Sequence, residues 1–183
     1  MRRLFIAIDI PENIRTILQE LIEEIPGVSW KRPDQYHITL KFLGDADEDR
    51  VVEVLKQISV RAFFLPIQGL GVFPKVDAPR VLWAGVGQGH PHLFQLYKKI
   101  QDSLYASGIQ PDLRPYSPHI TLARCSSQAH ESIRQLLKSF NDWHKLSIYI
   151  SEFQLYESIA RPTGNNYEPI QSFKLDSSIG NFL

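Results

Sequence analysis

The tetrapeptide His37-Ile38-Thr39-Leu40 recurs 82 residues later as His119-Ile120-Thr121-Leu122. Each copy alternates polar and apolar residues, which is the pattern of a β-strand with one buried face. In such a strand the histidine and threonine point to one face, and the isoleucine and leucine point to the other. The sequence therefore predicts two similar strands, each presenting an imidazole and a hydroxyl above an apolar anchor, and a chain built from two related halves.

Apolar periodicity around the two copies predicts a mixture of strands and helices. We expect strands over 3–10, 28–31, 37–43, 63–73, 81–86, 119–123, 146–156 and 167–173. We expect helices over 11–25, 51–58, 91–104 and 133–140. Strands and helices do not alternate regularly, which favours the α+β class with mainly antiparallel sheets. We expect one two-lobed domain over 1–183, with two sheets facing one another.

The charge balance limits the kind of partner. The chain has 20 Lys and Arg and 20 Asp and Glu, so its net charge is zero. A protein that coats long nucleic acid usually carries a strong basic excess. If this chain binds RNA, we expect it to bind a short end or a single nucleotide.

Cysteine usage and hydropathy indicate the compartment. Cys125 is the only cysteine, so the chain can form no internal disulfide, and a reducing compartment is favoured. The apolar run Leu4–Ile8 is too short for a signal peptide, and no stretch approaches the length of a membrane span. We expect a cytoplasmic protein without a membrane partner, and nothing in the pattern indicates an assembly larger than a monomer.

Two imidazoles on opposite sides of a reacting centre form an acid–base pair that works near neutral pH. In-line displacement at phosphorus needs this arrangement, because one group deprotonates the entering nucleophile and the other protonates the departing oxygen. The hydroxyls of Thr39 and Thr121 can donate hydrogen bonds to the non-bridging phosphate oxygens. The residue types alone do not say whether His37 or His119 is the acid.

Four further residues near the two motifs are candidates for substrate binding. Arg124 follows the second motif and Arg114 precedes it, and either guanidinium can hold a phosphate with two hydrogen bonds. Tyr116 and Phe42 can stack on a base. Each has an ordinary structural alternative, as a surface ion pair for the arginines or as a core side chain for the aromatic residues. A single histidine on a strand is likewise often only structural, and it is the repetition that favours catalysis.

A metal site is not expected. His90 and His92 form a His-x-His pair, but no carboxylate or cysteine partner accompanies them. The glycines at 85, 87 and 89 alternate without the full fingerprint of a phosphate-binding loop.

With both motifs in view, the chain resembles the two-histidine (2H) phosphoesterase superfamily, and within it the RNA 2′,3′-cyclic phosphodiesterases, also described as the 2′-5′ RNA ligase family. The similarity extends over nearly the whole chain. It is carried by the segments Arg3-Leu4-Phe5-Ile6-Ala7-Ile8-Asp9-Ile10-Pro11, His37-Ile38-Thr39-Leu40-Lys41-Phe42-Leu43-Gly44, Arg114-Pro115-Tyr116-Ser117-Pro118-His119-Ile120-Thr121-Leu122-Ala123-Arg124 and Phe153-Gln154-Leu155-Tyr156-Glu157-Ser158. One departure is Tyr116, where the family more often has phenylalanine.

The resemblance implies a bilobal α+β fold with pseudo-two-fold symmetry, helices on the outside and a cleft between two antiparallel sheets. It implies hydrolysis of a ribose 2′,3′-cyclic phosphate to a 2′-phosphomonoester without a metal or other cofactor. Carried over to this chain, His37 is the proton donor to the leaving 3′ oxygen and His119 is the proton acceptor that activates water. Thr39 and Thr121 hold the phosphate, with Arg124 as an assistant. The same residues would serve the reverse chemistry, in which RNA ends are joined through a 2′-5′ linkage.

The expected partners are RNA ends or nucleoside 2′,3′-cyclic phosphates, with tRNA halves among the candidates. An alternative is a binding module for nucleotides or RNA ends that no longer catalyses, although binding alone does not require both imidazoles. A second alternative is a metallohydrolase that uses the histidines as ligands, and the missing carboxylate motif argues against it.

Overall fold

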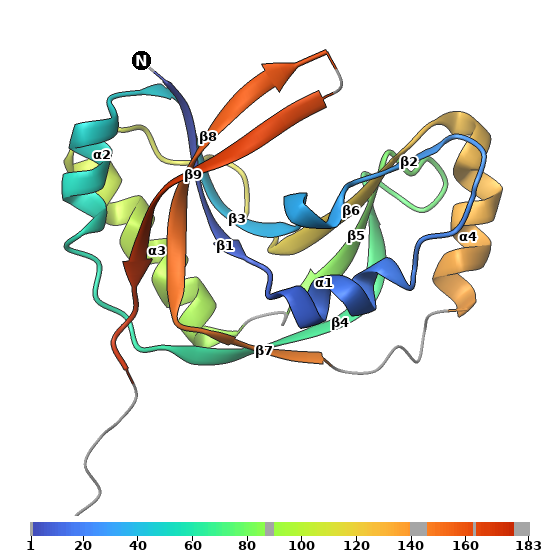
Figure 1. Cartoon of the computed structure of the whole chain (residues 1–183), viewed down its shortest axis with the longest axis horizontal. Helices are drawn as coiled ribbons and strands as arrows, with labels where there is room; N and C mark the ends of the chain where they lie inside the picture. The colour runs from blue at the N-terminus through green and yellow to red at the C-terminus, as the bar shows by residue number, and fades with distance from the viewer. Residues whose placement is uncertain (1, 87–89, 140–145, 163, 178–183) are drawn as a thin grey trace, which may run out of the picture.

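The computed structural model describes residues 2–86, 90–139, 146–162 and 164–177, and Figure 1 shows the arrangement of their elements. The strands are β1 (Arg2–Asp9), β2 (Val28–Trp30), β3 (His37–Ala46), β4 (Phe63–Phe73), β5 (Val81–Val86), β6 (His119–Cys125), β7 (Leu146–Ile150), β8 (Glu152–Arg161) and β9 (Gly164–Lys174). The helices are α1 (Glu12–Gln19), α2 (Glu48–Leu55), α3 (Pro91–Ala106) and α4 (His130–Ser139), with short 3₁₀ turns η1 (Pro33–Gln35) and η2 (Ser127–Ala129). The mixed α+β class expected from the sequence is confirmed.

The strands of the described residues form a nine-stranded sheet in the order β7-β4-β5-β6-β3-β1-β8-β9, with β2 paired to β6 off this path. All of the pairings between these strands are antiparallel, as expected. Two sheets are expected from the sequence, whereas the structure has one continuous sheet with two halves, β7-β4-β5-β6 and β3-β1-β8-β9. They are joined in the middle by the two motif strands, through the single pair Ile38↔Ile120.

The two halves repeat one succession of elements. In the first, β1, α1, β3 and α2 follow one another, and in the second β5, α3, β6 and α4 do so, with β2 as an addition in the first. Figure 1 shows α2 and α3 together at one side of the curled sheet and α1 and α4 at the other. Each half therefore contributes one helix to each side, as a pseudo-two-fold relation requires. No helix in the described part of the chain is long and apolar enough to cross a membrane.

Strand β1 is buried on both faces, which explains its continuous apolar run. Leu4, Ile6 and Ile8 belong to the main core. Phe5 and Ala7 point to the other face, where they form a second, smaller cluster with Tyr156 and the partly buried Tyr167. A run without polar alternation is typical of a strand covered on both sides. This smaller cluster lies on the face that carries the functional side chains described below.

The structure corrects several boundaries expected from the sequence, and the helix expected over 51–58 is α2, Glu48–Leu55. The segment 146–156 is not one strand, because Ser151 separates β7 from β8. Strand β7 pairs with β4 in one half and β8 pairs with β1 in the other, so the chain crosses between the halves at this break. The first helix ends at Gln19 rather than continuing to residue 25. An apolar pattern records burial, and it does not record that the strand changes partners or that the helix stops.

Candidate active site

The register of the two motif strands brings both motifs onto one face of the sheet. Strands β3 and β6 meet in one antiparallel pair, Ile38↔Ile120, and continuing this register would bring His37 toward Thr121 and Thr39 toward His119. The two isoleucines are fully buried, whereas the four polar residues are partly exposed. The imidazoles and hydroxyls therefore form a group of four on the opposite face of the sheet from the main core.

A β-bulge lies at the last residue of each motif. The ladder between β1 and β3 shifts at Leu40, and the ladder between β5 and β6 shifts at Leu122. A bulge adds one residue to a strand and so reverses the alternation of faces beyond it. As a result the fifth residue after each histidine returns to the histidine face. These residues are Phe42, whose exposed fraction is 69%, and the exposed Arg124.

The two imidazoles are held in the same way. Nδ1 of His37 lies 2.8 Å from the backbone oxygen of Gln35, and Nδ1 of His119 lies 2.8 Å from the backbone oxygen of Ser117. A carbonyl oxygen only accepts hydrogen bonds, so each Nδ1 carries the proton and donates it. In the neutral imidazole this leaves the Nε2 lone pair free to accept a proton. Each histidine is thus oriented for acid–base chemistry through Nε2.

Aromatic rings surround His37. Its ring centroid lies 5.2 Å from that of Phe5 and 5.2 Å from that of Tyr167, which meets it edge-on. Burial lowers the pKa of His37 to about 4, and the positive charges of Lys31 and His119 add smaller effects in the same direction. The hydrogen bond to the backbone carbonyl opposes this shift. The effect of one histidine on the pKa of the other indicates that the two imidazoles share one electrostatic environment.

His119 has a comparable aromatic support in the second half. Its ring centroid lies 5.0 Å from that of Phe73 and 6.2 Å from that of Trp83. The indole of Trp83 lies against Gly71 on the neighbouring strand, where an added Cβ would meet the ring at 2.2 Å. Burial lowers the pKa of His119, and the hydrogen bond to a backbone carbonyl opposes the shift. Both histidines are therefore neutral at pH 7 in the free protein, and a bound anion would raise both pKa values.

The loop that delivers the second motif is attached to the first motif strand. The phenol ring of Tyr116 stacks on Tyr97 with centroids 3.9 Å apart, and its hydroxyl donates to the backbone oxygen of Thr39 over 3.2 Å. Burial raises the pKa of Tyr116. This packing favours a structural role for Tyr116 over stacking on a base. Arg114 is exposed on the same loop and lines neither of the two cavities described below.

A buried lysine provides a second attachment. Lys41 follows the first motif, has an exposed fraction of 2%, and places Nζ 3.5 Å from a carboxylate oxygen of Asp112. Gln101 of α3 donates to the same carboxylate over 3.0 Å. Asp112 thus connects the loop before β6 to both β3 and α3. No local pattern in the sequence indicates this contact, because the partners are far apart along the chain.

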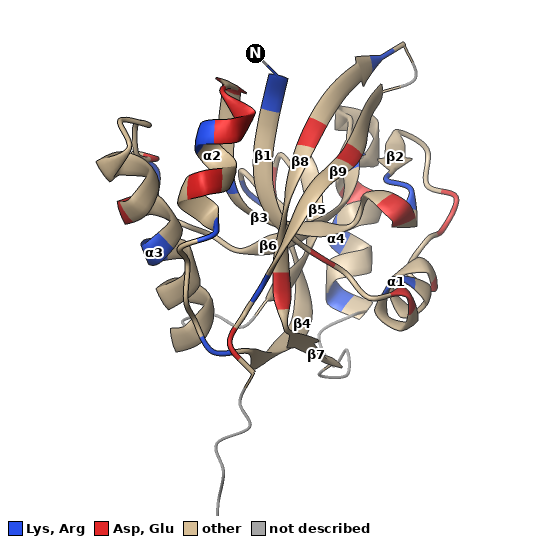
Figure 2. Cartoon of the chain, turned by 60° about the vertical axis from the view of Figure 1, so that its left-hand side comes forward, with Lys and Arg blue, Asp and Glu red and all other residues tan. Residues whose placement is uncertain are grey.

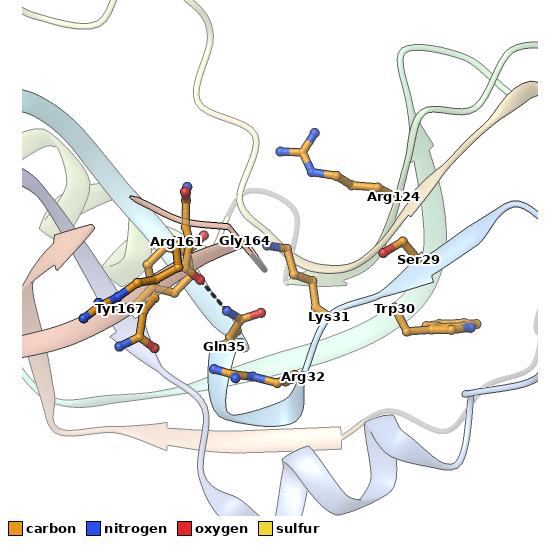
Figure 3. Close-up of a pocket in the computed structure, with 11 residues that line it drawn as sticks. Ser29, Trp30, Lys31, Arg32, Gln35, Arg124, Arg161, Gly164 and Tyr167 are labelled. Atoms are coloured by element: carbon orange, nitrogen blue, oxygen red, sulfur yellow. Dashed lines mark hydrogen bonds between the residues drawn. The ribbon is translucent and has the colours of Figure 1, made fainter. Parts of the chain in front are cut away.

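Two neighbouring cavities share Asn165 and Tyr167 in their walls, and one of them is lined by His37. The smaller has a volume of about 150 Å³ and is lined by His37 and Phe42, among others. The larger has a volume of about 620 Å³, and Figure 3 shows the side chains around it. Its walls are formed by Ser29, Trp30, Lys31, Arg32, Gln35, Arg124, Arg161, Gly164, Asn165, Asn166 and Tyr167.

Sequence reasoning placed Arg124 and Phe42 near the histidines, and the structure brings both to the cavity walls. It missed Lys31, Arg161 and Tyr167. Lys31 precedes a turn with no motif of its own, and the other two come from β8 and β9 at the opposite end of the chain. Only the pairing of β8 with β1 brings them to the site.

Among the described residues, no group of three or more histidine, cysteine, aspartate or glutamate side chains is arranged to hold a metal ion. The rings of His90 and His92 lie 5.9 Å apart and both stack on Phe63, in a different part of the chain from the two motifs.

The fold and this arrangement are those of a phosphoesterase family. The family model of the LigT-like phosphoesterases matches residues 8–83 and 86–165, which include both motifs. The chain belongs to this family, and the resemblance to the two-histidine phosphoesterases inferred from the sequence is confirmed.

Relatives named as RNA 2′,3′-cyclic phosphodiesterases match almost end to end. The Methanocaldococcus jannaschii protein is 30% identical over 175 residues, which cover 93% of this chain and 99% of the relative. The Aquifex aeolicus protein is 31% identical over 177 residues, with 93% and 94% covered. The Escherichia coli protein is 31% identical over 180 residues, with 95% and 97% covered. The expectation that the chain is an enzyme of the phosphodiesterase class is confirmed.

Solved structures agree in fold. The crystal structure of E. coli LigT in its apo form superimposes with a TM-score of 0.76 at 27% identity, covering 95% of this chain and 97% of that one. The E. coli LigT structure complexed with 3′-AMP gives a TM-score of 0.72 at 26% identity, covering 95% and 98%.

Proposed function

We propose that the protein hydrolyses RNA or nucleotide 2′,3′-cyclic phosphate ends to 2′-phosphomonoesters, with His37 and His119 as the acid–base pair and without a metal ion. The observation that carries the proposal is the group of four formed by the motif strands. Two imidazoles, each with Nδ1 held by a backbone carbonyl, lie on one face beside two threonine hydroxyls. The names of the relatives support the same substrate class.

The proposed reaction is one in-line displacement at phosphorus. Nε2 of His119 takes a proton from water as the water oxygen forms a bond to phosphorus. The bond from phosphorus to the ribose 3′ oxygen breaks, and His37 gives a proton to that oxygen. Each proton transfer contributes about 10²- to 10⁴-fold to the rate. The histidines end with their protonation states exchanged, and proton exchange with solvent restores them.

Charge on the phosphate is held by neighbouring donors. Thr39 and Thr121 lie two residues after the histidines on the same strand face and can donate to the non-bridging oxygens. Arg124, brought to the same face by the bulge at Leu122, supplies the cation. Phe42 lies beside His37 in the smaller cavity and offers an exposed ring to a base.

The acid role of His37 depends on the substrate. Its pKa of about 4 leaves it neutral in the free protein at pH 7. A cyclic phosphate carries one negative charge, and an opposite charge within a few ångströms raises the pKa of an imidazole. The bound substrate would thereby favour the protonated state that the departing oxygen needs.

Two further parts of the proposal concern the reverse reaction and the location. A ribose hydroxyl of a second RNA can replace water as the nucleophile, which would join two RNA ends through a 2′-5′ linkage at the same residues. A cytoplasmic location is proposed because the chain has one cysteine and therefore no internal disulfide. Action as a monomer, and on tRNA halves among other RNA ends, is part of the same proposal.

The test is incubation with the four nucleoside 2′,3′-cyclic phosphates in excess chelator, followed by chromatographic identification of the product. We expect turnover to the 2′-monophosphate at a rate that chelator does not change. Formation of the 3′-monophosphate, or loss of activity in chelator, would contradict the mechanism. Binding of a 2′-nucleotide without turnover of any cyclic phosphate would indicate a binding module.

A further inference from the structure

The larger cavity collects positive charge that the overall composition does not suggest. Lys31, Arg32, Arg124 and Arg161 line it, and the residues described in its walls include no aspartate or glutamate. The chain as a whole has equal numbers of acidic and basic residues. Figure 2 shows both signs interspersed over α2 and α3, and a basic residue at the tip of β8. The cavity is thus a local concentration of cations on a neutral protein.

These cations come from three separate elements. Lys31 and Arg32 lie between β2 and η1, Arg124 lies on β6, and Arg161 ends β8. In Figure 3 the ammonium of Lys31 and the guanidinium of Arg124 extend toward the same open space, with Arg161 on the hairpin side. The side-chain amide of Gln35 donates to the backbone oxygen of Asn165 over 2.7 Å, which ties the hairpin to η1.

Their mutual repulsion is largely uncompensated within the described residues. Arg32 pairs with the carboxylate of Asp34 at 3.1 Å, and no other of the four forms an ion pair with a carboxylate among those residues. Burial lowers the pKa of Lys31, and the positive charges of Arg124 and Arg32 lower it further. Like charges held together without a counter-charge favour binding of an anion.

The cavity continues from the proposed reaction site. Tyr167 lines both cavities and touches the ring of His37, and Arg124 lies on the same strand and face as His119. Its volume of about 620 Å³ is about four times that of the smaller cavity beside His37. The terminal phosphate occupies one point between the histidines, so cations beyond Arg124 are in excess of what a mononucleotide requires.

We propose that this cavity binds the internucleotide phosphates of an RNA strand whose 2′,3′-cyclic phosphate end lies between His37 and His119. The inference rests on the proposed function and narrows its substrate to oligonucleotide ends. Phosphates that follow one another along a single strand match cations distributed over β2, η1 and the β8–β9 hairpin. A single nucleotide has no internucleotide phosphate to place there.

The first experiment compares kcat/KM for a nucleoside 2′,3′-cyclic phosphate and for a trinucleotide that ends in the same cyclic phosphate. We expect the wild-type protein to favour the trinucleotide by about tenfold at low salt, with a preference that falls as salt rises. Replacing the internucleotide phosphates by neutral methylphosphonates should remove the preference. This comparison needs no variant, so a folding defect cannot obscure it.

The second experiment uses Arg161→Gln and Lys31→Gln, with Lys98→Gln as the matched control. Lys98 pairs with Asp102 on α3, away from this cavity. Each cavity variant should lower kcat/KM more for the trinucleotide than for the mononucleotide. It should also make the plot of log kcat/KM against log salt shallower by about 0.7, the value for one phosphate contact on a single strand. The control should keep the wild-type preference and slope.

The outcomes separate this inference from the proposed function. Turnover of the mononucleotide with no trinucleotide preference would overturn the inference and leave the proposed function standing. An equal loss on both substrates in the cavity variants, with an unchanged salt slope, would also overturn it. Absence of turnover of either substrate by the wild-type protein would overturn both.

Discussion

The two halves of the sheet hold their histidines with the same backbone geometry but surround them with different side chains. In both, a His-x-Thr strand carries a bulge at the last residue of the motif, and Nδ1 of the histidine donates to a backbone carbonyl two residues earlier. The halves differ just after the bulge. The first places Lys41 inward and Phe42 outward, whereas the second places Ala123 inward and Arg124 outward. The shared backbone geometry orients the two imidazoles alike. The differing residues place an aromatic ring, Phe42, on the first motif strand and a cation, Arg124, on the second.

The two halves also differ in the aromatic residues that pack against the histidine rings. His37 is packed by Phe5 and Tyr167 and has a pKa of about 4, while His119 is packed by Phe73 and Trp83 and also has a lowered pKa. In both halves burial by the surrounding side chains is the main cause of the lowered pKa.

The largest expected effect is loss of either imidazole. His37→Asn and His119→Asn should each lower kcat on a nucleoside 2′,3′-cyclic phosphate by about 10²- to 10⁴-fold. The kcat of the double variant should be only slightly lower than that of the less active single variant, because the two groups act as a unit. Steady-state kinetics test this, with His92→Asn as the control because it lies on α3 against Phe63. Retention of more than a tenth of the activity in either motif variant would contradict the shared role.

The next largest effect is expected at Arg124 and Phe42, the outward-facing residues beyond the two bulges. Arg124→Gln should lower kcat/KM by about 10- to 100-fold, since a charged hydrogen bond contributes about 1.5 to 3 kcal/mol. Phe42→Leu, at the matching position of the first half, should raise KM by a smaller factor with little change in kcat. An equal loss of kcat/KM in the two variants would mean that Arg124 and Phe42 do not differ in function.

A third effect tests the inward residues. Lys41→Ala gives the first half the alanine that the second half has at Ala123, and it should lower the free energy of unfolding by about 2 kcal/mol through lost packing. Lys41→Met keeps the volume, and should cost less than about 1 kcal/mol because the partner Asp112 is partly exposed and remains hydrated. Urea denaturation measures both. A methionine variant as unstable as the alanine variant would show that the ion pair, rather than packing, holds the loop.

The smallest effect concerns the charge of Lys31, which lowers the pKa of His37 and is not among the causes that lower the pKa of His119. Lys31→Met removes a positive charge that lowers the pKa of His37, so that pKa should rise, while the pKa of His119 should stay unchanged. NMR titration of the imidazole C–H signals measures both. A shift of both signals, or of neither, would show that Lys31 does not distinguish the two sites.

The same titration predicts the direction of acid destabilisation. The folded-state pKa of His37 lies below the ordinary value of 6.5, so the unfolded chain binds the proton more readily. The stability due to neutral His37 is complete above pH 6.5 and is lost as the pH falls toward 4. The loss amounts to up to about 3 kcal/mol. His37→Gln should reduce this dependence, as thermal unfolding between pH 7 and pH 4 can measure.

The sequence predicted the motif strands, and with them the α+β class and the antiparallel pairing, because alternation over a few residues reports which face of a strand is buried. It also marked Arg124 and Phe42 as neighbours of the motifs. It could not show the bulges at Leu40 and Leu122, which depend on how each strand pairs with its partner. Without a bulge, Arg124 would face away from His119.

The break at Ser151 escaped sequence analysis for a related reason. The residues on both sides of it are apolar and strand-forming, so the pattern reads as one strand. The chain breaks there because β7 and β8 pair in different halves of the sheet. That switch places Arg161 and Tyr167 at the cavity, where no spacing in the sequence links them to His37.

By itself, the sequence determined the two imidazole–hydroxyl pairs and their apolar anchors, because side-chain direction along a strand is a local property. Only the tertiary structure decided which residues meet across the sheet. The pair Ile38↔Ile120 joins the two motif strands, and the path of β8 and β9 adds Arg161 and Tyr167 from the far end of the chain. The physical reason is that register and strand order are fixed by burying the whole core at once, which no local segment records.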